Sequence, residues 1–274
     1  SKLLCYKKDK KEISHHVFYE LPDFLNENDV LVLNNTKVLP AKFFVENDNG
    51  KKIEILLISS VSSDNLMWKA FVKGVPRVRD LPWQVCTADT SLSSLQIKIE
   101  IIDNETIKFK SHDDLKFVLE KIGKMPLPPY IKRTGEPESG RVGEGKFDDN
   151  DRYQTVFAKE PGAVAAPTAS LHFTEELLGK IKNKGVEILC LTLHVGPGTF
   201  LPIRTDDVRD HKLMPEKFSI EKEVWERILE HKKNGKRIVA CGTTVTRTLE
   251  YLGNCHSRLD RESSLIIQSP PNPD

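Results

Sequence analysis

The sequence predicts an α/β protein with a β-rich module in its first half. Short, partly alternating segments bounded by Asn, Asp, Gly or Ser predict strands at 52–59, 68–73, 94–102 and 106–110. After residue 112 the pattern changes to alternating helices and strands, which indicates a mixed sheet with at least some parallel pairing. We therefore expect a small β-barrel or sandwich that ends near residue 112, followed by an α/β part with helices flanking its sheet.

The second half of the chain supplies this alternation. Thr174 can cap a helix that runs to about Lys184, with two glutamates in its first turn and Gly185 past its end. The apolar run VEILCLTLHV at 186–195 predicts a buried strand. The other predicted elements are helices at 113–122, 221–235 and 244–252, a strand at 237–241, and a loop at 134–151 that lacks hydrophobic spacing.

The composition favours a cytoplasmic globular protein. Of the 274 residues, 38% are apolar and 30% are charged, and no apolar run approaches the length of a membrane span, so we expect no membrane contact. The five cysteines are widely spaced without a CxxC pair, which favours a reducing compartment. The histidines show no metal-ligand spacing, so we expect no metal. A net charge of +1 gives no general case for nucleic-acid binding, although a local basic face can still bind phosphates.

Four segments suit chemistry better than a plain core. The first is MPLPPYIKR at 125–133, whose three closely spaced prolines make a stiff, extended segment. This segment presents Tyr130, Lys132 and Arg133. A rigid linker and a substrate-facing edge are both open interpretations of it.

The second segment runs from residue 153 to residue 174 and is rich in small residues. It contains YQTVFA and GAVAAPTASLHFT, and such residues let a backbone approach a ligand closely. His172 lies two residues before the predicted helix cap. Because histidine is the side chain best tuned to act near neutral pH, His172 is a candidate for catalysis or binding. The alternative is a structural histidine.

The third and fourth segments are glycine turns after predicted strands, where ligands of open α/β sheets collect. LHVGPGTFLP at 193–202 contains two glycines, and CGTTVTR at 241–247 places free N–H groups at a helix start. The segment at 241–247 matches neither a Walker loop nor a GxGxxG fingerprint, which disfavours a nucleoside triphosphate or dinucleotide. The carboxylate of an amino-acid moiety would suit the helix start. For the third segment, a glycine turn without a function is the alternative.

Six stretches of the chain resemble one known family. They are NDVLVLNNTKVLPAKF (28–43), PLPPYIKR (126–133), RYQTVFA (152–158), GAVAAPTASLHFT (162–174), LHVGPGTFLPI (193–203) and CGTTVTRTLE (241–250). They are long, occur in the right order and reach over nearly the whole chain. On these stretches the chain resembles the S-adenosylmethionine:tRNA ribosyltransferase-isomerase family of queuosine biosynthesis.

The resemblance implies both a domain organisation and a reaction. Residues 1–37 and 113–274 would form a discontinuous α/β catalytic domain, and residues 38–112 would be a small β-barrel domain inserted in it. The enzyme would transfer and isomerise the ribosyl moiety of S-adenosylmethionine onto 7-aminomethyl-7-deazaguanine at the wobble position of a tRNA with a GUN anticodon. Epoxyqueuosine-tRNA, adenine and methionine would be the products. S-adenosylmethionine would be a co-substrate, and no tightly bound cofactor is expected.

The implied reaction assigns roles to the candidate residues. We expect S-adenosylmethionine between the two glycine turns, at Gly196, Gly198, Thr199, Gly242, Thr243, Thr244 and Arg247. The substrate amine must lose a proton before it attacks, so a base is needed, and His172 and His194 are the candidates. The target base must leave its stack, and we expect contacts to the tRNA substrate from Tyr130, Lys132, Arg133, Tyr153, Gln154 and Thr168.

The sequence departs from the family pattern at a few positions. Ser170 stands where a glycine is usual, and Met214 replaces the second histidine of an HxMHxE-type motif. The family's TNFHLP-type C-terminal motif is also absent from this sequence. Two other hypotheses stay open. One is a catalytically silent tRNA-binding relative, and the other, which sets the resemblance aside, is a nucleoside or sugar-phosphate enzyme that binds phosphate at 242–244.

Overall fold

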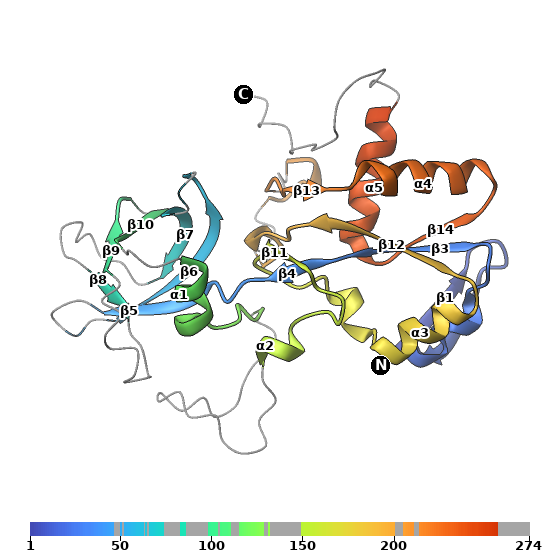
Figure 1. The fold of residues 1–274 in the computed structure, drawn as a ribbon, viewed down its shortest axis with the longest axis horizontal. Coiled ribbons are helices and arrows are strands. Elements are labelled where there is room, and N and C mark those ends of the chain that lie inside the picture. Colours follow the sequence, from blue (N-terminus) through green and yellow to red (C-terminus); the bar gives the residue numbers. More distant parts are fainter. Residues whose placement is uncertain are drawn as a thin grey trace, which may run out of the picture.

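A computed structural model of the chain shows a β-rich unit and an α/β sheet at opposite ends of the molecule (Figure 1). The mixed α/β class predicted from the sequence is therefore confirmed. The residues that the structure describes are 1–46, 50, 52–62, 64, 66–73, 83–85, 98–103, 105–110, 115–128, 131, 149–200, 205–210 and 214–256.

The larger sheet has four strands in the order β13-β12-β3-β14. The central strand β3 runs parallel to β12 and β14, while β13 is antiparallel to β12. All six residues of β3 are buried, as expected for a strand of a parallel sheet that is covered on both faces. The strands are β3 (Asp29–Asn34), β12 (Glu187–Leu193), β13 (Phe218–Ser219) and β14 (Arg237–Ala240).

Alternate residues of β3 belong to two different cores, because successive side chains of a strand point to opposite faces. Val30 and Val32 join a core cluster with helices α4 and α5, whereas Leu31 and Leu33 join a cluster with α3 and the 3-10 helix η1. The sheet is thus covered on both faces. The covering elements are η1 (Phe18–Phe24), α3 (Glu175–Asn183), α4 (Lys222–Lys233) and α5 (Gly242–His256).

Helix α3 has the ends that the sequence predicts. The hydroxyl of Thr174 accepts a hydrogen bond from the N–H of Leu177 at 3.1 Å, which satisfies one of the free donors of the first turn. Past the last turn, Gly185 has a φ of +80°, a conformation that glycine adopts without steric cost. The predicted cap and stop signal are both confirmed. Helix α5 begins two residues before the predicted 244 and continues to His256.

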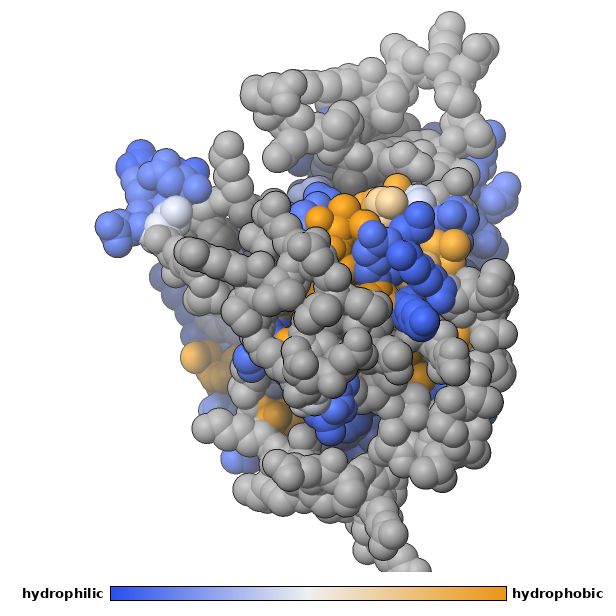
Figure 2. Space-filling view, turned by 90° about the vertical axis from the view of Figure 1, so that its left-hand side faces the viewer, coloured by the Kyte–Doolittle hydropathy of each residue, from blue (hydrophilic) through white to orange (hydrophobic). Residues whose placement is uncertain are grey.

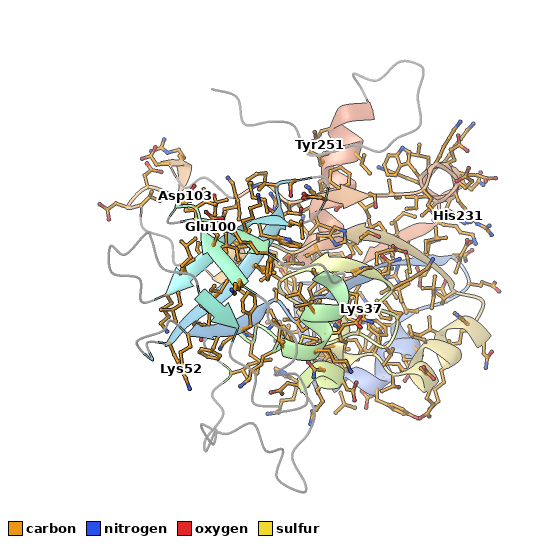
Figure 3. The ribbon with its side chains drawn as sticks, turned by 60° about the vertical axis from the view of Figure 1, so that its left-hand side comes forward. Lys37, Lys52, Glu100, Asp103, His231 and Tyr251 are labelled. Atoms are coloured by element: carbon orange, nitrogen blue, oxygen red, sulfur yellow. The ribbon has the colours of Figure 1, made fainter. Side chains whose placement is uncertain are left out.

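Two short strand pairs complete this half of the molecule. Strands β1 (Lys2–Lys7) and β2 (Glu12–Val17) form an antiparallel hairpin. Strand β4 (Thr36–Val38) leaves the sheet just after β3 and pairs in parallel with β11 (Glu160–Ala163). In Figure 3, Lys37 of β4 lies between the β-rich unit and the larger sheet, while His231 lies at the end far from the β-rich unit. The β4–β11 pair therefore connects the two halves.

The β-rich unit is an antiparallel sheet in the order β9-β10-β7-β6-β5. The three-residue strand β8 pairs with β5 and with β9 through two residues each, so the hydrogen-bonded order closes on itself as a barrel. Strand β8 lies outside the ranges that the sequence analysis predicted as strands. The strands are β5 (Lys42–Glu46), β6 (Lys52–Ser60), β7 (Met67–Lys73), β8 (Trp83–Val85), β9 (Lys98–Ile101) and β10 (Thr106–Lys110).

The β-rich unit has its own core, in which Phe43 and Phe109 pack with their ring centroids 5.9 Å apart. Helix α1 (Leu115–Ile122) contributes Val118 and Leu119 to the same cluster, so this helix packs with the strands that precede it. Viewed from this end of the molecule, the described surface is a mixture of hydrophilic and hydrophobic patches (Figure 2). The apolar residues exposed on the β-rich unit include Val61, Phe71 and Ile102.

The loop predicted at 134–151 is wrong at its end, because residues 149–151 belong to the short helix α2 (Asp149–Arg152). The rest of that loop lies outside the described residues. Three 3-10 helices complete the described chain: η3 (Thr168–His172), η4 (Pro197–Phe200) and η5 (Val208–Asp210). Among the described helices, none combines the length and the apolar character needed to cross a membrane.

Candidate functional site

A buried asparagine at the carboxyl end of β3 brings the glycine turns together. Asn34 Nδ2 donates to the carbonyl of Leu193 at 3.0 Å, and Asn34 Oδ1 accepts from the N–H of Leu193 at 3.0 Å. The same Nδ2 reaches Thr244 Oγ1 at 3.3 Å, in the first turn of α5. Because Asn34 is fully buried, its amide must be satisfied inside the protein, and these bonds hold the ends of β3, β12 and the start of α5 in register.

A cavity of about 280 Å³ opens beside this junction. One wall is the segment 165–169, and the opposite wall is the start of α5, so small side chains and backbone form most of the lining. Several predicted site residues meet here although they come from three separate segments. The residues that line the cavity are Tyr153, Ala165, Ala166, Pro167, Thr168, Ala169, Val195, Gly242, Thr243 and Thr244.

The start of α5 supplies hydrogen-bond donors to this cavity. Gly242 has a φ of +84°, and a Cβ at this position would lie 3.1 Å from the Cβ of Ala169 on the opposite wall. Glycine therefore permits both the turn and the close approach of the two walls. The first N–H groups of a helix lack intrahelical acceptors and carry partial positive charge, which favours an anionic group of a ligand.

The turn at 196–198 is fixed from the side by Glu216. Glu216 Oε1 accepts from the N–H of Gly196 at 3.0 Å, and its Oε2 accepts from Arg247 Nη1 at 2.5 Å. A Cβ on Gly198 would lie 3.2 Å from the Cβ of Met214, so the residue that departs from the family motif packs against this turn. Gly196, Gly198 and Arg247 thus belong to one connected region next to the cavity, although the residues that line the cavity do not include them.

His194 lies one residue before the cavity residue Val195, in a largely enclosed position. Its Nδ1 is 2.8 Å from Thr36 Oγ1, and a Cβ on Gly162 would come within 2.7 Å of its ring. Burial lowers the pKa of His194 below its usual value, with a smaller opposing effect from the charge of Glu160. The side chain is therefore neutral near pH 7, as a proton acceptor or a neutral donor must be.

His172 has different surroundings. It is exposed at the end of η3, its Nδ1 is 2.8 Å from Ser1 Oγ, and its ring centroid is 5.2 Å from that of Phe18. Thr168, at the start of the same 3-10 helix, lines the cavity, whereas neither His172 nor His194 belongs to the lining. The two predicted histidines therefore lie in separate environments.

Other candidate side chains are engaged with the backbone or with each other. The amide of Gln154 accepts from the N–H of Val38 at 3.0 Å and donates to its carbonyl at 2.8 Å, which fixes β4 against the segment 153–158. Cys241 precedes α5, and its Sγ is 3.4 Å from the hydroxyl of the buried Ser170. Burial raises the pKa of the Cys241 thiol, so it stays protonated near neutral pH.

The remaining candidates cannot be placed around the cavity. Tyr130, Lys132 and Arg133 lie outside the described residues, and of Thr199 only its place in η4 is described. Within the described ranges, no three His, Cys, Asp or Glu side chains gather in a way that could hold a metal ion.

Sequence reasoning missed Asn34, Thr36 and Glu216 as functional positions. A polar pair directly after an apolar strand was a usable signal for Asn34 and Thr36, because such residues lie at the sheet edge where ligands collect. For Glu216 the signal was its place as the last residue of the HxMHxE-type motif, which reads HKLMPE at 211–216, although its two partners lie 20 and 31 residues away.

Comparisons with known proteins match most of the chain. The family model described as "Queuosine biosynthesis protein" matches residues 1–273. The chain is 44% identical over 254 residues to an S-adenosylmethionine:tRNA ribosyltransferase-isomerase of Thermodesulfovibrio yellowstonii, an alignment that covers 91% of this chain and 68% of the relative. It is 41% identical over 251 residues to the protein of the same name from Halothermothrix orenii, covering 91% and 69%.

One solved structure, a crystal structure of S-adenosylmethionine tRNA ribosyltransferase from Thermotoga maritima, matches with a TM-score of 0.37 and 25% identity, covering 92% of this chain and 65% of that one. This chain thus spans about two thirds of the length of these proteins. The match over residues 1–273 and the identities above 40% establish the family. The chain belongs to the queuosine biosynthesis protein family.

Proposed function

We propose that this chain is a tRNA ribosyltransferase-isomerase of queuosine biosynthesis that uses S-adenosylmethionine as co-substrate. It transfers and isomerises the ribosyl moiety onto 7-aminomethyl-7-deazaguanine at the wobble position of a tRNA with a GUN anticodon. Epoxyqueuosine-tRNA, adenine and methionine are the products. The observation that carries the proposal is the cavity between segment 165–169 and the start of α5, in a chain that is 44% identical to a relative bearing this enzyme name.

In this proposal S-adenosylmethionine binds in the cavity, with its carboxylate at the start of α5. Gly242, Thr243 and Thr244 line the cavity, and they belong to the first turn of α5, the helix end whose N–H groups attract anions. The turn at Gly196 and Gly198, held through Glu216 and Arg247, borders the same region. A site made of backbone donors and small side chains suits S-adenosylmethionine as a co-substrate that exchanges freely with solvent.

The proposal assigns chemistry to His194 rather than to His172. The ring of His194 is enclosed and oriented by Thr36, and it directly precedes a residue of the cavity wall. His172 is exposed and touches Ser1 and Phe18 instead. For the tRNA, we retain Tyr130 as a stacking surface and Lys132 and Arg133 as phosphate contacts, with Tyr153 and Thr168 on the cavity side.

We also infer that the β-rich unit is an inserted barrel domain. Its separate core supports this division, and the predicted insertion of residues 38–112 covers its strands. Because Val118 and Leu119 of α1 belong to that core, we place the end of the inserted domain after α1. The catalytic domain then consists of residues 1–37 and the chain that follows α1.

The proposed function is tested by release of adenine from labelled S-adenosylmethionine. The protein is incubated with a tRNA that carries 7-aminomethyl-7-deazaguanine at the wobble position, and an unmodified tRNA is the control. Release that depends on the modified base supports the transferase. Binding of both substrates without release would favour the silent tRNA-binding relative. Phosphate bound at 242–244 without binding of S-adenosylmethionine would favour a nucleoside or sugar-phosphate enzyme.

A further inference from the structure

We propose that His194 acts as a neutral hydrogen-bond donor through Nε2–H, and that Thr36 is the positioning residue that sets this tautomer. The proposal rests on the proposed function, because it assigns a role to His194 within that site. It differs from the expectation that His194 is a base. The donor would serve a hydrogen-bond acceptor on the bound substrate, a nitrogen or an oxygen of its nucleoside part.

Thr36 is held rigidly where it meets the histidine. It is fully buried in β4, and its backbone N–H donates to Asn34 Oδ1 at 3.2 Å. Asn34 is itself fixed by its bonds to Leu193, the residue before His194. The hydroxyl and the imidazole are therefore positioned by the same buried amide, and the 2.8 Å distance between Thr36 Oγ1 and His194 Nδ1 is determined by the sheet.

The hydrogen-bonding needs of Thr36 decide the tautomer. A buried hydroxyl has one proton to donate, and leaving a buried donor without an acceptor is costly. Among the described residues, the one hydrogen-bonding partner of Thr36 Oγ1 is His194 Nδ1. The hydroxyl therefore donates to Nδ1, which must be unprotonated to accept. In a neutral imidazole the single proton then resides on Nε2.

The surroundings of the ring keep it neutral and leave Nε2 available. Enclosure by the protein is the largest effect and lowers the pKa of His194; the charge of Glu160 opposes it, and the cation of Lys217 adds a smaller effect in the same direction as enclosure. Gly162 lies against the ring, and a Cβ there would come within 2.7 Å of Cε1 and Nδ1, so the ring cannot move toward β11. Within the described part of the chain, Nε2 has no protein hydrogen-bonding partner, which leaves its N–H for a ligand.

The tautomer can be measured without activity. The ¹⁵N signals of His194 are recorded on the full chain at about pH 8 and assigned by their loss in His194→Gln. We expect a pyridine-like Nδ1 and a pyrrole-like Nε2 in the parent protein and in Thr36→Ser, which keeps the hydroxyl. In Thr36→Val we expect a mixture of tautomers. A pyrrole-like Nδ1 in the parent protein would overturn the proposal.

Turnover of two His194 variants shows whether His194 acts as a hydrogen-bond donor or as a base. Glutamine offers an amide N–H but cannot take up a proton, whereas leucine offers neither. We expect His194→Gln to keep turnover within about tenfold of the parent and His194→Leu to lower it by about 10²–10³-fold, the usual loss for one donor. Equal losses in both folded variants would overturn the donor role. If the parent protein releases no adenine at all, the proposed function fails, while the ¹⁵N signals still decide the tautomer.

Discussion

Arg247 in α5 donates to the carboxylate of Glu216 at 2.5 Å, and the other oxygen of that carboxylate accepts from the N–H of Gly196 at 3.0 Å. One side chain thus links the glycine turn after β12 to the helix that follows β14. The side chain of Glu216 is 12% exposed, whereas that of Arg247 is 44% exposed. Loss of the Glu216 side chain should therefore destabilise this link more than loss of the Arg247 side chain.

The difference in exposure between Glu216 and Arg247 predicts which variant loses more stability. Glu216→Ala should lower the free energy of unfolding by about 1–3 kcal/mol, because the enclosed N–H of Gly196 and the guanidinium both lose their acceptor. Arg247→Ala should cost less than about 1 kcal/mol, since its partly exposed ion pair is screened by water. Denaturant unfolding of both variants checks this order, and a larger loss in Arg247→Ala would contradict it.

Gly162 should tolerate no side chain, because of its contact with His194. It has a φ of +153°, and a Cβ would lie 2.7 Å from the imidazole. We expect Gly162→Ala to lower the free energy of unfolding by about 1–3 kcal/mol, as overpacking usually does, and to lower turnover by displacing the ring from Thr36. The control is Gly179→Ala in α3, where nothing lies within 4 Å, and it should gain about 1 kcal/mol of helix stability. Similar melting temperatures for the two variants would argue against the contact.

The lowered pKa of His194 predicts how stability responds to acid. The unfolded chain binds a proton near the ordinary value of 6.5, while the folded chain binds it at lower pH. The contribution of His194 is therefore present above about pH 6.5 and is lost as the pH falls through the folded pKa. Unfolding free energies at about pH 8 and pH 5.5 should show a larger acid-induced loss in the parent protein than in His194→Gln. An equal loss in both would contradict the enclosed, neutral state of the ring.

The cavity beside α5 predicts which glycine controls binding of S-adenosylmethionine. Gly242→Ala places a methyl group 3.1 Å from Ala169 and strains a left-handed residue, so the two walls must shift. We expect the affinity for S-adenosylmethionine to fall about tenfold or more, which corresponds to about 1.4 kcal/mol. Gly253→Ala, in the same helix with nothing within 4 Å, should bind like the parent. Calorimetry on both variants measures this, and unchanged binding in a folded Gly242→Ala would remove α5 from the site.

Local signals in the sequence anticipated the elements of the α/β part well. Strand β12 and helix α3 were predictable because an apolar run of strand length and a Thr174 cap with Gly185 depend on neighbouring residues alone. The glycine turns that border the cavity were predictable for the same reason, since each directly follows a strand. Strand β8 was not predicted, because three residues are too few to show a periodic pattern.

The sequence by itself determined the apolar run that forms β12 and the signals that begin and end α3, because these depend on neighbouring residues alone. Only the tertiary structure decided that Thr36 meets His194, 158 residues further along the chain, and that Glu216 joins Gly196 to Arg247. The periodicity of a strand specifies which face of the sheet each side chain occupies. The order of the strands in the sheet decides which side chains from distant parts of the sequence come into contact. The sequence therefore predicts candidate residues, whereas the contacts of Thr36 and Glu216 depend on partners that folding brings to them.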